Sequence, residues 1–261
     1  MIGSKNKIRR YKNLVKKVVN WRKYLWKKVV GFDDYFEFHL RNSFSIKVPG
    51  KMLPPFKENF FDEIYLYNLP AGVFDKEEIT VVDIGGNVGF FSLMIFSKFP
   101  KAKVFSFEPH PYCYGILEKY KNDYSQFDFQ IFRKAVSDKN ESITLNTSDT
   151  NDFATMSSIH ASDHRTEKIQ VEGISLERIL QEHVNSKIDL LKIDCEGAEY
   201  AILYNLPPAY FKTIRALSIE THRGEGAEEN LQALATFLTA RGYAVTSLDE
   251  GFTGYIWAWT R

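Results

Sequence analysis

From residue 78 onward, short apolar runs alternate with segments whose apolar residues have helical spacing. Such runs are typical of buried parallel strands, and the intervening segments are typical of helices that cover a sheet. The runs predict strands within residues 79–86, 103–109, 129–138, 168–176, 188–197, 214–222, 243–248 and 255–261. The spacing predicts helices within residues 88–99, 112–124, 176–184 and 228–240, and one from about residue 198. This alternation predicts a mostly parallel sheet with helices on both faces. The last two strands, joined by residues 249–254, predict an antiparallel hairpin.

The first 75 residues follow a different pattern. Residues 1–32 combine apolar residues at helical spacing with eleven Lys and Arg and no acid, which predicts a basic amphipathic N-terminal segment. Residues 33–75 are rich in aromatic side chains and contain the turn region KVPGKMLPPF, so we expect a lead-in segment packed on the core. Residues 76–261 then form the main α/β domain.

The composition indicates how large a hydrophobic core the chain can form and in which cellular compartment it is expected. The 261 residues are 44% hydrophobic and 15% aromatic, which is enough for a large core. No apolar run reaches the roughly 18–20 residues of a transmembrane helix, and the charged N-terminus lacks the apolar region of a signal peptide. The two cysteines, Cys113 and Cys195, do not make a disulfide framework. We therefore expect a cytoplasmic protein.

The net charge of +1 conceals an uneven distribution. Outside residues 1–32 the chain has 23 basic and 33 acidic residues, a net charge of −10. The cations beside Trp21, Tyr24 and Trp26 favour a helix lying on an anionic membrane surface, with the protein peripheral to the membrane. A helix packed on the acidic domain, or on a second subunit of an oligomer, is an equally supported interpretation. Nucleic acid is disfavoured because the acidic domain repels phosphates.

Small residues lie between the first core strand and the first core helix. The sequence VVDIGGNVG puts Asp83, Gly85, Gly86, Asn87 and Gly89 at the carboxyl end of a parallel strand, where open α/β sheets bind ligands. Glycine and asparagine tolerate a positive φ, and glycine lets a ligand approach the backbone. The dinucleotide pattern Gly-x-Gly-x-x-Gly is not satisfied. The order Asp-x-Gly-x-Asn-x-Gly instead resembles the loop that binds S-adenosylmethionine, and a plain tight turn is the structural alternative.

A single acid follows the second core strand. Glu108 lies 23 residues after Gly85, and an acid at about this spacing accepts both hydrogen bonds of a ribose diol. The loop and the acid together predict an adenosine cofactor, although an exposed glutamate at a strand end is an alternative. Ala135, between Lys134 and Val136, is expected from its position alone to flank the adenine.

Charged residues end two later strands. In LLKIDCEGAE, Lys192, Asp194 and Glu196 alternate with apolar residues, so we expect them to share one face. In SIETH, Glu220 and His222 are also two residues apart. Because these strands are expected to be neighbours, three carboxylates and an imidazole should converge where a methyl acceptor would lie.

This group has three interpretations. In the first, His222, Asp194, Glu220 or Glu196 is a general base that takes a hydroxyl proton, with a carboxylate orienting the imidazole. In the second, Asp194, Glu220 and His222 bind a divalent metal ion. In the third, the charges form a structural network, with Glu196 and Glu199 at a helix N-terminus, where acids are favoured. Asp194 is also placed to bind the ammonium group of the cofactor.

The sequence resembles the FkbM-type family of S-adenosylmethionine-dependent methyltransferases. The resemblance rests on VVDIGGNVGFFSL, VFSFEPHP, AVSD, VEGISLERIL, IDLLKIDCEGAEYAIL and LSIETH, which follow in this order over residues 80–222. Its most specific part is KIDCEGAE together with the glycine loop, and Gly86 stands where alanine is common in the family. The resemblance implies the class I methyltransferase variant of the Rossmann-like α/β fold, with a seven-stranded sheet closed by the hairpin.

The resemblance also implies an activity, the O-methylation of sugar hydroxyls in glycans, glycolipids or glycosylated natural products. A carbohydrate or glycoconjugate acceptor is therefore the expected partner. The family pattern assigns five residues to the cofactor site: Asp83, Gly85, Asn87, Gly89 and Glu108. It assigns four residues to the surroundings of the reaction centre: Asp194, Glu196, Glu220 and His222. Alternative functions are methylation of a non-sugar small molecule or an amine, and a non-catalytic module that binds the cofactor or a glycan. The complete charged set favours an enzyme.

Overall fold

The computed structural model describes residues 2–148, 166–184 and 187–260. The chain divides into two compact units, an N-terminal unit that extends to Tyr67 and a C-terminal unit that begins at Asn68. Each unit has buried apolar residues of its own. The division between the two units lies at residues 67 and 68, and the domain start expected at residue 76 stays a prediction.

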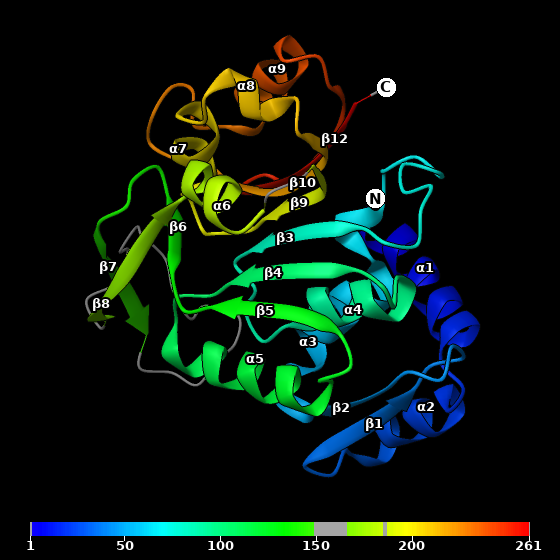
Figure 1. Ribbon diagram of the computed structural model, residues 1–261. Coiled ribbons are helices and arrows are strands. Elements are labelled where there is room, and N and C mark those ends of the chain that lie inside the picture. Colours follow the sequence, from blue (N-terminus) through cyan, green and yellow to red (C-terminus); the bar gives the residue numbers. More distant parts are fainter. Residues whose placement is uncertain (1, 149–165, 185–186, 261) are drawn as a thin grey trace. The chain divides into compact units, whose positions relative to one another are not determined.

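The N-terminal unit consists of helices, helical turns and a pair of strands (Figure 1). Its helices are α1 (Ile2–Lys17), α2 (Trp21–Val30) and α3 (Leu53–Lys57), with the short helical turns η1 (Gly50–Met52), η2 (Glu58–Asp62) and η3 (Ile64–Leu66). Its strands β1 (Tyr35–His39) and β2 (Ser45–Pro49) form an antiparallel pair. Phe36 and Phe38 alternate with exposed or half-buried residues along β1, and both are buried. The Phe38 ring stacks on Phe56 with centroids 4.4 Å apart.

The segments predicted as separate, 1–32 and 33–75, are joined in this unit. The backbone N–H of Val19 donates to the carbonyl of His39, and that of Arg41 donates to the carbonyl of Lys17. Val18 also forms an antiparallel bridge with Leu40. The sequence boundary at residue 32 has no counterpart in the structure, because the end of α1 is hydrogen-bonded to the residues after β1.

The C-terminal unit is built on a seven-stranded sheet with the order β11-β12-β10-β9-β3-β4-β5. Its strands are β3 (Thr80–Ile84), β4 (Lys103–Phe107), β5 (Asp128–Phe132), β9 (Ile188–Ile193), β10 (Ile214–His222), β11 (Ala244–Asp249) and β12 (Thr253–Trp259). The first five are parallel, and β12 lies antiparallel between β10 and β11. The predicted mostly parallel sheet with a C-terminal antiparallel hairpin is confirmed, and its architecture is that of the class I methyltransferase fold.

Helices cover both faces of this sheet (Figure 1). One face carries α4 (Phe90–Lys98) and α5 (Pro111–Asp123), and the other carries α6 (Leu176–Glu182), α7 (Glu199–Tyr204), α8 (Pro208–Phe211) and α9 (Leu231–Ala240). The second group shares one buried apolar cluster with the strands, in which Ile193 and Leu217 of the sheet lie with Ile179, Leu203 and Leu238 of the helices. Strands covered on both faces have continuous apolar runs, as the sequence indicated.

One predicted strand is two strands in the structure. The run within residues 129–138 divides into β5 and β6 (Ala135–Ser137), and these belong to different sheets. β6 pairs with β8 (Thr166–Ser175), which also pairs with β7 (Ser142–Ser148), a strand that the sequence did not predict. The prediction of one strand was wrong because Arg133 and Lys134 interrupt the run between β5 and β6. The apolar character of a run does not show that its two halves pair with different strands.

Two expectations from composition concern thiols and membrane spans. Cys113 and Cys195 are free cysteines, and burial raises the pKa of both thiols. A thiol with a raised pKa stays protonated and unreactive at neutral pH. Among the helices that the structure describes, none is both long enough and apolar enough to cross a membrane.

Candidate active site

The candidate site lies at the carboxyl edge of the C-terminal sheet. The strand register pairs Ile84 of β3 with Ile193 of β9, and Ile193 with Ile219 of β10. The loop of residues 85–89 follows β3, residues 194–198 follow β9, and β10 ends at His222. The three strand ends therefore meet at one edge, which is where open α/β sheets bind ligands.

The loop of residues 85–89 has a backbone that needs glycine. A Cβ on Gly85 would lie 1.7 Å from the carbonyl oxygen of Asp194, and one on Gly86 would lie 2.1 Å from the Ser106 hydroxyl oxygen. Neither position has room for a side chain unless the backbone moves. The residues of the loop with a positive φ are Gly85 at 75°, Asn87 at 48° and Gly89 at 86°. The loop therefore turns tightly at the edge of the sheet, where the backbone N–H groups of Gly85 and Gly86 both donate to the carbonyl oxygen of Phe107 at 3.0 Å.

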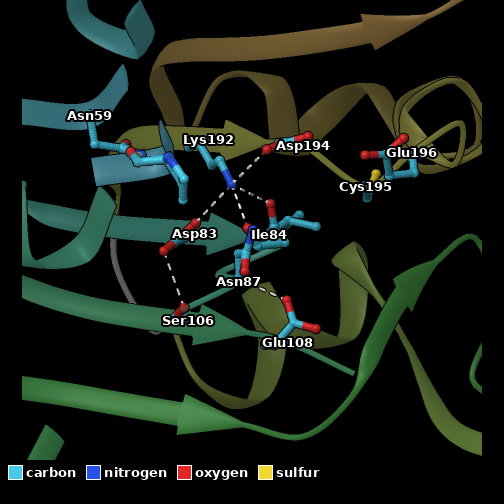
Figure 2. A network of polar contacts seen from close by, with 12 residues as sticks. Asn59, Asp83, Ile84, Asn87, Ser106, Glu108, Lys192, Asp194, Cys195 and Glu196 are labelled. Atoms are coloured by element: carbon cyan, nitrogen blue, oxygen red, sulfur yellow. Dashed lines mark hydrogen bonds and ion pairs between the residues drawn. The ribbon is translucent and has the colours of Figure 1, made fainter. Parts of the chain in front are cut away.

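Asp83 supports this loop from beneath. Its side chain is fully buried and accepts hydrogen bonds from the hydroxyls of Ser92 at 2.7 Å and Ser106 at 3.1 Å (Figure 2). Its second oxygen lies 3.3 Å from Nζ of Lys192. Asp83 therefore supports the loop from a fully buried position, and its predicted contact with the cofactor stays a prediction.

Lys192 connects the loop to the neighbouring strand β9. Its Nζ donates to the carbonyl oxygens of Ile84 at 3.2 Å and Gly85 at 2.6 Å, and lies 3.6 Å from the Asp194 carboxylate (Figure 2). The side chain is only 3% exposed. Burial lowers the pKa of Lys192, but the charges of Asp83 and Asp194 outweigh this effect and raise it. Lys192 is therefore a buried cation that fixes the loop, a role that sequence reasoning did not assign to it.

Glu108 lies beside the loop, as predicted. Its two carboxylate oxygens accept hydrogen bonds from the backbone N–H groups of Asn87 and His110, each at 2.8 Å (Figure 2). Burial raises the pKa of Glu108 to about 7, although both hydrogen bonds lower it. A carboxylate has about four acceptor positions, so two remain, the number that a ribose diol needs.

Ala135 has a different position from the other predicted cofactor residues. It is buried in β6, paired with Gly173 of β8, and belongs to the three-stranded sheet. It packs in a small apolar cluster with Leu145 and Val171. Its role beside an adenine stays a prediction.

The second part of the site is an imidazole between two carboxylates. Nε2 of His222 lies 3.4 Å from the Glu196 carboxylate, and Nδ1 lies 3.4 Å from the Glu199 carboxylate. Glu199 is completely buried at the start of α7 and accepts the backbone N–H groups of His222 at 2.6 Å and Gly197 at 2.8 Å. Glu199 therefore holds both the backbone and the ring of His222.

This arrangement favours a charged imidazole. Burial lowers the pKa of His222, but the Glu199 contact and the charges of Glu196, Glu199 and Asp194 outweigh it and raise the pKa to about 9. Burial raises the pKa of Glu196, as do Asp194 and Glu199, whereas His222 lowers it, and the net shift is upward. At neutral pH the site therefore contains an imidazolium beside a carboxylate that is more basic than an ordinary glutamate.

Glu196 does not continue the alternation of β9. The strand ends at Ile193, and Glu196 has a φ of 52°, followed by Gly197 at 110°. The turn ends the alternation by which Lys192, Asp194 and Glu196 were expected to share a face, yet carboxylate oxygens of Asp194 and Glu196 lie within 4.8 Å of each other. A non-glycine residue in this conformation is strained, which is common at functional sites.

The structure also changes the set of metal-ligating candidates. Among the described residues, one ligand atom each of Asp194, Glu196 and His222 lies within 4.8 Å of the others. Glu220, predicted as the third ligand with Asp194 and His222, is not a member of this group. Glu220 is half-buried in β10, and its charge acts on Lys192.

The first part of the site fits the adenosine portion of S-adenosylmethionine. Glu108 lies beside the loop of residues 85–89 and has acceptor capacity for a ribose diol. In the described structure, the side-chain oxygen of Asn87 is buried without a hydrogen-bond partner. A buried acceptor of this kind is costly unless a donor satisfies it, which supports a ligand at the loop.

Comparison with known proteins agrees with this geometry. The model of the methyltransferase FkbM domain matches residues 83–245. Methyltransferase sdnD of Sordaria araneosa is 28% identical over 221 residues, covering 73% of this chain and 82% of the relative. Methyltransferase 1 of Beauveria bassiana is 26% identical over 206 residues, covering 72% of this chain and 80% of the relative.

A solved structure supports the fold. The methyltransferase FkbM from Methylobacillus flagellatus aligns with a TM-score of 0.50 at 11% identity, covering 78% of this chain and 52% of that structure. At this identity the likeness concerns the fold alone. The FkbM model, by contrast, matches more than half of the chain, including the glycine loop and both charged strand ends. The chain belongs to the FkbM family of S-adenosylmethionine-dependent methyltransferases.

Proposed function

We propose that this protein is an O-methyltransferase that methylates a sugar hydroxyl of a glycan, glycolipid or glycosylated natural product. The observation that carries the proposal is the order Glu199–His222–Glu196, in which a buried acid fixes an imidazolium beside a basic carboxylate. Hydroxyl groups are weakly acidic, so their methylation needs a proton acceptor, whereas a cofactor-binding module has no use for one.

The glycine loop and Glu108 would hold the cofactor. When bound, S-adenosylmethionine supplies an electrophilic methyl group on a sulfonium sulfur. The loop of residues 85–89 would contact it, and Glu108 would accept hydrogen bonds from the ribose hydroxyls. Lys192 holds the loop through the carbonyl oxygen of Gly85. Asp194, next to the loop, is placed to bind the ammonium group. The chain thus aligns donor and acceptor, which lowers the barrier through proximity.

The geometry favours Glu196 over His222 as the base. With a pKa of about 9, His222 already carries its proton at neutral pH and has no free lone pair to accept another. The Glu196 side chain is 48% exposed and therefore accessible to an acceptor. Glu196 would take the hydroxyl proton at a carboxylate oxygen, and His222 would stabilise and orient that carboxylate.

The sugar preference is supported by the surroundings of the base. Asp194, Glu196 and Glu220 offer several acceptors to a polyol with neighbouring hydroxyls. Thr253 pairs with His222 in the register of β10 and β12, and the preceding Phe252 has a ring that is 72% exposed. An exposed aromatic residue next to the strand pair that ends at His222 would suit the apolar face of a sugar ring. A non-sugar small molecule or an amine as acceptor is the alternative.

A divalent metal ion is the alternative to a carboxylate base. Asp194, Glu196 and His222 would hold it, and it would lower the pKa of a bound hydroxyl. A metal needs the neutral imidazole, however, and the two carboxylates beside His222 stabilise the protonated form. A metal would therefore compete with the proton on His222, and chelation distinguishes a metal from a carboxylate base.

The test is transfer of a labelled methyl group to matched pairs of glycosides and aglycones. Glu196→Gln is expected to lower kcat by roughly 100-fold to 10,000-fold, the range for loss of a general base. Its affinity for S-adenosylhomocysteine, measured by calorimetry, should stay within about twofold of the parent, because Glu196 is not at the glycine loop. The control is Glu118→Gln, which changes an exposed glutamate of α5 and should leave both values unchanged.

Three results would contradict parts of this proposal. Full activity of Glu196→Gln would remove Glu196 as the base. Equal transfer to glycosides and their aglycones would remove the sugar as the acceptor. Activity that a chelator abolishes and a divalent ion restores would replace the carboxylate base with a metal.

A further inference from the structure

One side of helix α1, which we call its inner face, packs against the rest of the N-terminal unit. Leu14 and Val18, at and just beyond its end, are 1% and 0% exposed. Arg10 forms a salt bridge with Asp62, and Nζ of Lys17 lies 2.6 Å from the Glu63 carboxylate. The apolar residues and cations of this face are therefore buried or paired within the unit.

The opposite side, which we call the outer face of α1, consists of Ile8, Tyr11, Lys12, Val15 and Lys16. These residues line one open hollow of ≈ 620 Å³. Ile8, Tyr11 and Val15 are 57%, 43% and 42% exposed, and their spacing of three and four residues puts them on one side of the helix. A helix that covers a core needs only one apolar face, and the inner face already fills that role. Folding of the unit therefore does not explain the apolar residues of the outer face.

Unpaired cations accompany this apolar face. Lys12 and Lys16 are exposed, and no described carboxylate forms an ion pair with either. Nζ of Lys28, from α2, lies 3.1 Å from the Tyr11 hydroxyl, which adds a third cation at the border of the face. The inner cations are paired and the outer ones are not, so the outer charge is available to a partner.

The exposed side of α2 has the same composition. Trp26, Val29 and Val30 are 60%, 86% and 54% exposed, and Arg22 and Lys23 are exposed as well. Apolar residues, tryptophan and cations together are typical of helices that lie in the interface of an anionic bilayer. Residues 1–32 hold eleven cations and no acid, which fits an anionic surface.

We propose that the outer face of α1 and the exposed side of α2 bind the surface of an anionic phospholipid membrane. A second copy meeting the same face would bring Lys12 and Lys16 against their own counterparts, which is unfavourable. A lipid surface instead takes the apolar side chains into the headgroup region and the lysines to its phosphates. This inference rests on the N-terminal unit and is independent of the proposed acceptor.

The experiment is flotation of the full chain with vesicles of phosphatidylcholine alone or mixed with phosphatidylglycerol. We expect binding to the mixed vesicles only, weakened by high salt. Lys12→Glu/Lys16→Glu should weaken it by more than about tenfold, because each cation near an anionic surface contributes about fivefold, or about 1 kcal/mol. Ile8→Ser/Val15→Ser should also weaken it by removing the apolar contact.

Matched substitutions elsewhere on the surface are the controls. Lys139→Glu/Lys212→Glu changes net charge by the same amount at two exposed lysines of the C-terminal unit, and Tyr112→Ser removes an exposed aromatic ring of α5. Both should bind mixed vesicles as the parent does. Circular dichroism of each variant shows that it is folded.

Two outcomes would overturn the proposal. One is no binding to mixed vesicles at low salt, or binding that the outer-face variants reduce no more than the controls do. The other is a dimer in light scattering that Ile8→Ser/Val15→Ser converts to a monomer in the absence of vesicle binding, which would assign the face to a second copy.

Discussion

At the scale of single residues, the candidate site depends on atoms that approach more closely than ordinary side chains allow. The carbonyl oxygen of Asp194 occupies the space where a Cβ of Gly85 would be. Glu196 adopts a left-handed conformation, and the buried Glu199 turns toward the backbone of His222. Such features cost free energy in folding, so they are typical of sites where function determines the residue.

Gly85→Ala tests the close approach in the glycine loop. The added methyl group overlaps the Asp194 carbonyl oxygen and meets an unfavourable positive φ, so the loop must move. We expect at least about tenfold weaker binding of S-adenosylhomocysteine in calorimetry, a loss of about 1.4 kcal/mol. Gly115→Ala is the control, because Gly115 lies in α5 with nothing within 4 Å of an added Cβ, and it should raise stability by about 0.5–1 kcal/mol. Unchanged affinity in Gly85→Ala would show that the loop does not contact the cofactor.

At the scale of elements, the loop after β3 takes its position from the neighbouring strand. Lys192 extends from β9 to the carbonyl oxygens of Ile84 and Gly85, and the register of β3 with β9 places it opposite Asp83. A buried lysine between two acids is costly to desolvate, and its value lies in fixing one arrangement of the two elements.

Lys192→Met tests this link between strand and loop. Removing one partner of a buried ion pair leaves Asp83 uncompensated, which costs about 3–5 kcal/mol. We expect the free energy of unfolding, measured in urea, to fall by this amount, and the binding of S-adenosylhomocysteine to weaken. Lys187→Met changes an exposed lysine just before the same strand and should stay within about 0.5 kcal/mol of the parent. Equal stability of the two variants would mean that Lys192 does not hold the loop.

The same elements show how far the sequence could predict the structure. Runs such as ITVVDIGG indicate strands because a doubly covered sheet requires apolar residues on both faces. The spacing of Gly85 and Glu108 predicts a cofactor at the carboxyl edge of the sheet, and this role stays a prediction. The run within residues 129–138 failed because strand pairing is a tertiary property. Glu199 was read only as an acid at a helix start, since its contact with His222 joins residues 23 positions apart. The left-handed turn at Glu196 could not be predicted from the alternation of apolar and charged residues.

At the scale of the whole molecule, proton binding links the site to stability. Relative to their ordinary values, the pKa of His222 rises to about 9, that of Glu108 rises to about 7, and that of Glu196 rises as well. Each raised pKa means that the folded chain binds a proton more tightly than the unfolded chain does. The stabilisation by such a group is complete below its unfolded pKa and is lost as the pH rises through its folded pKa.

His222 should dominate the alkaline part of this dependence. Its contribution is complete below pH 6.5, its unfolded value, and disappears as the pH rises through about 9. We expect the Tm of the parent protein to fall between these limits, and that of His222→Gln to be lower at pH 6.5 but to fall less with pH. His39→Gln is the matched control, since His39 is an exposed histidine in β1, and its Tm should follow the parent curve. Parallel curves for His222→Gln and the parent would show that His222 is neutral in the folded protein, and His222 would then return as a candidate for the base.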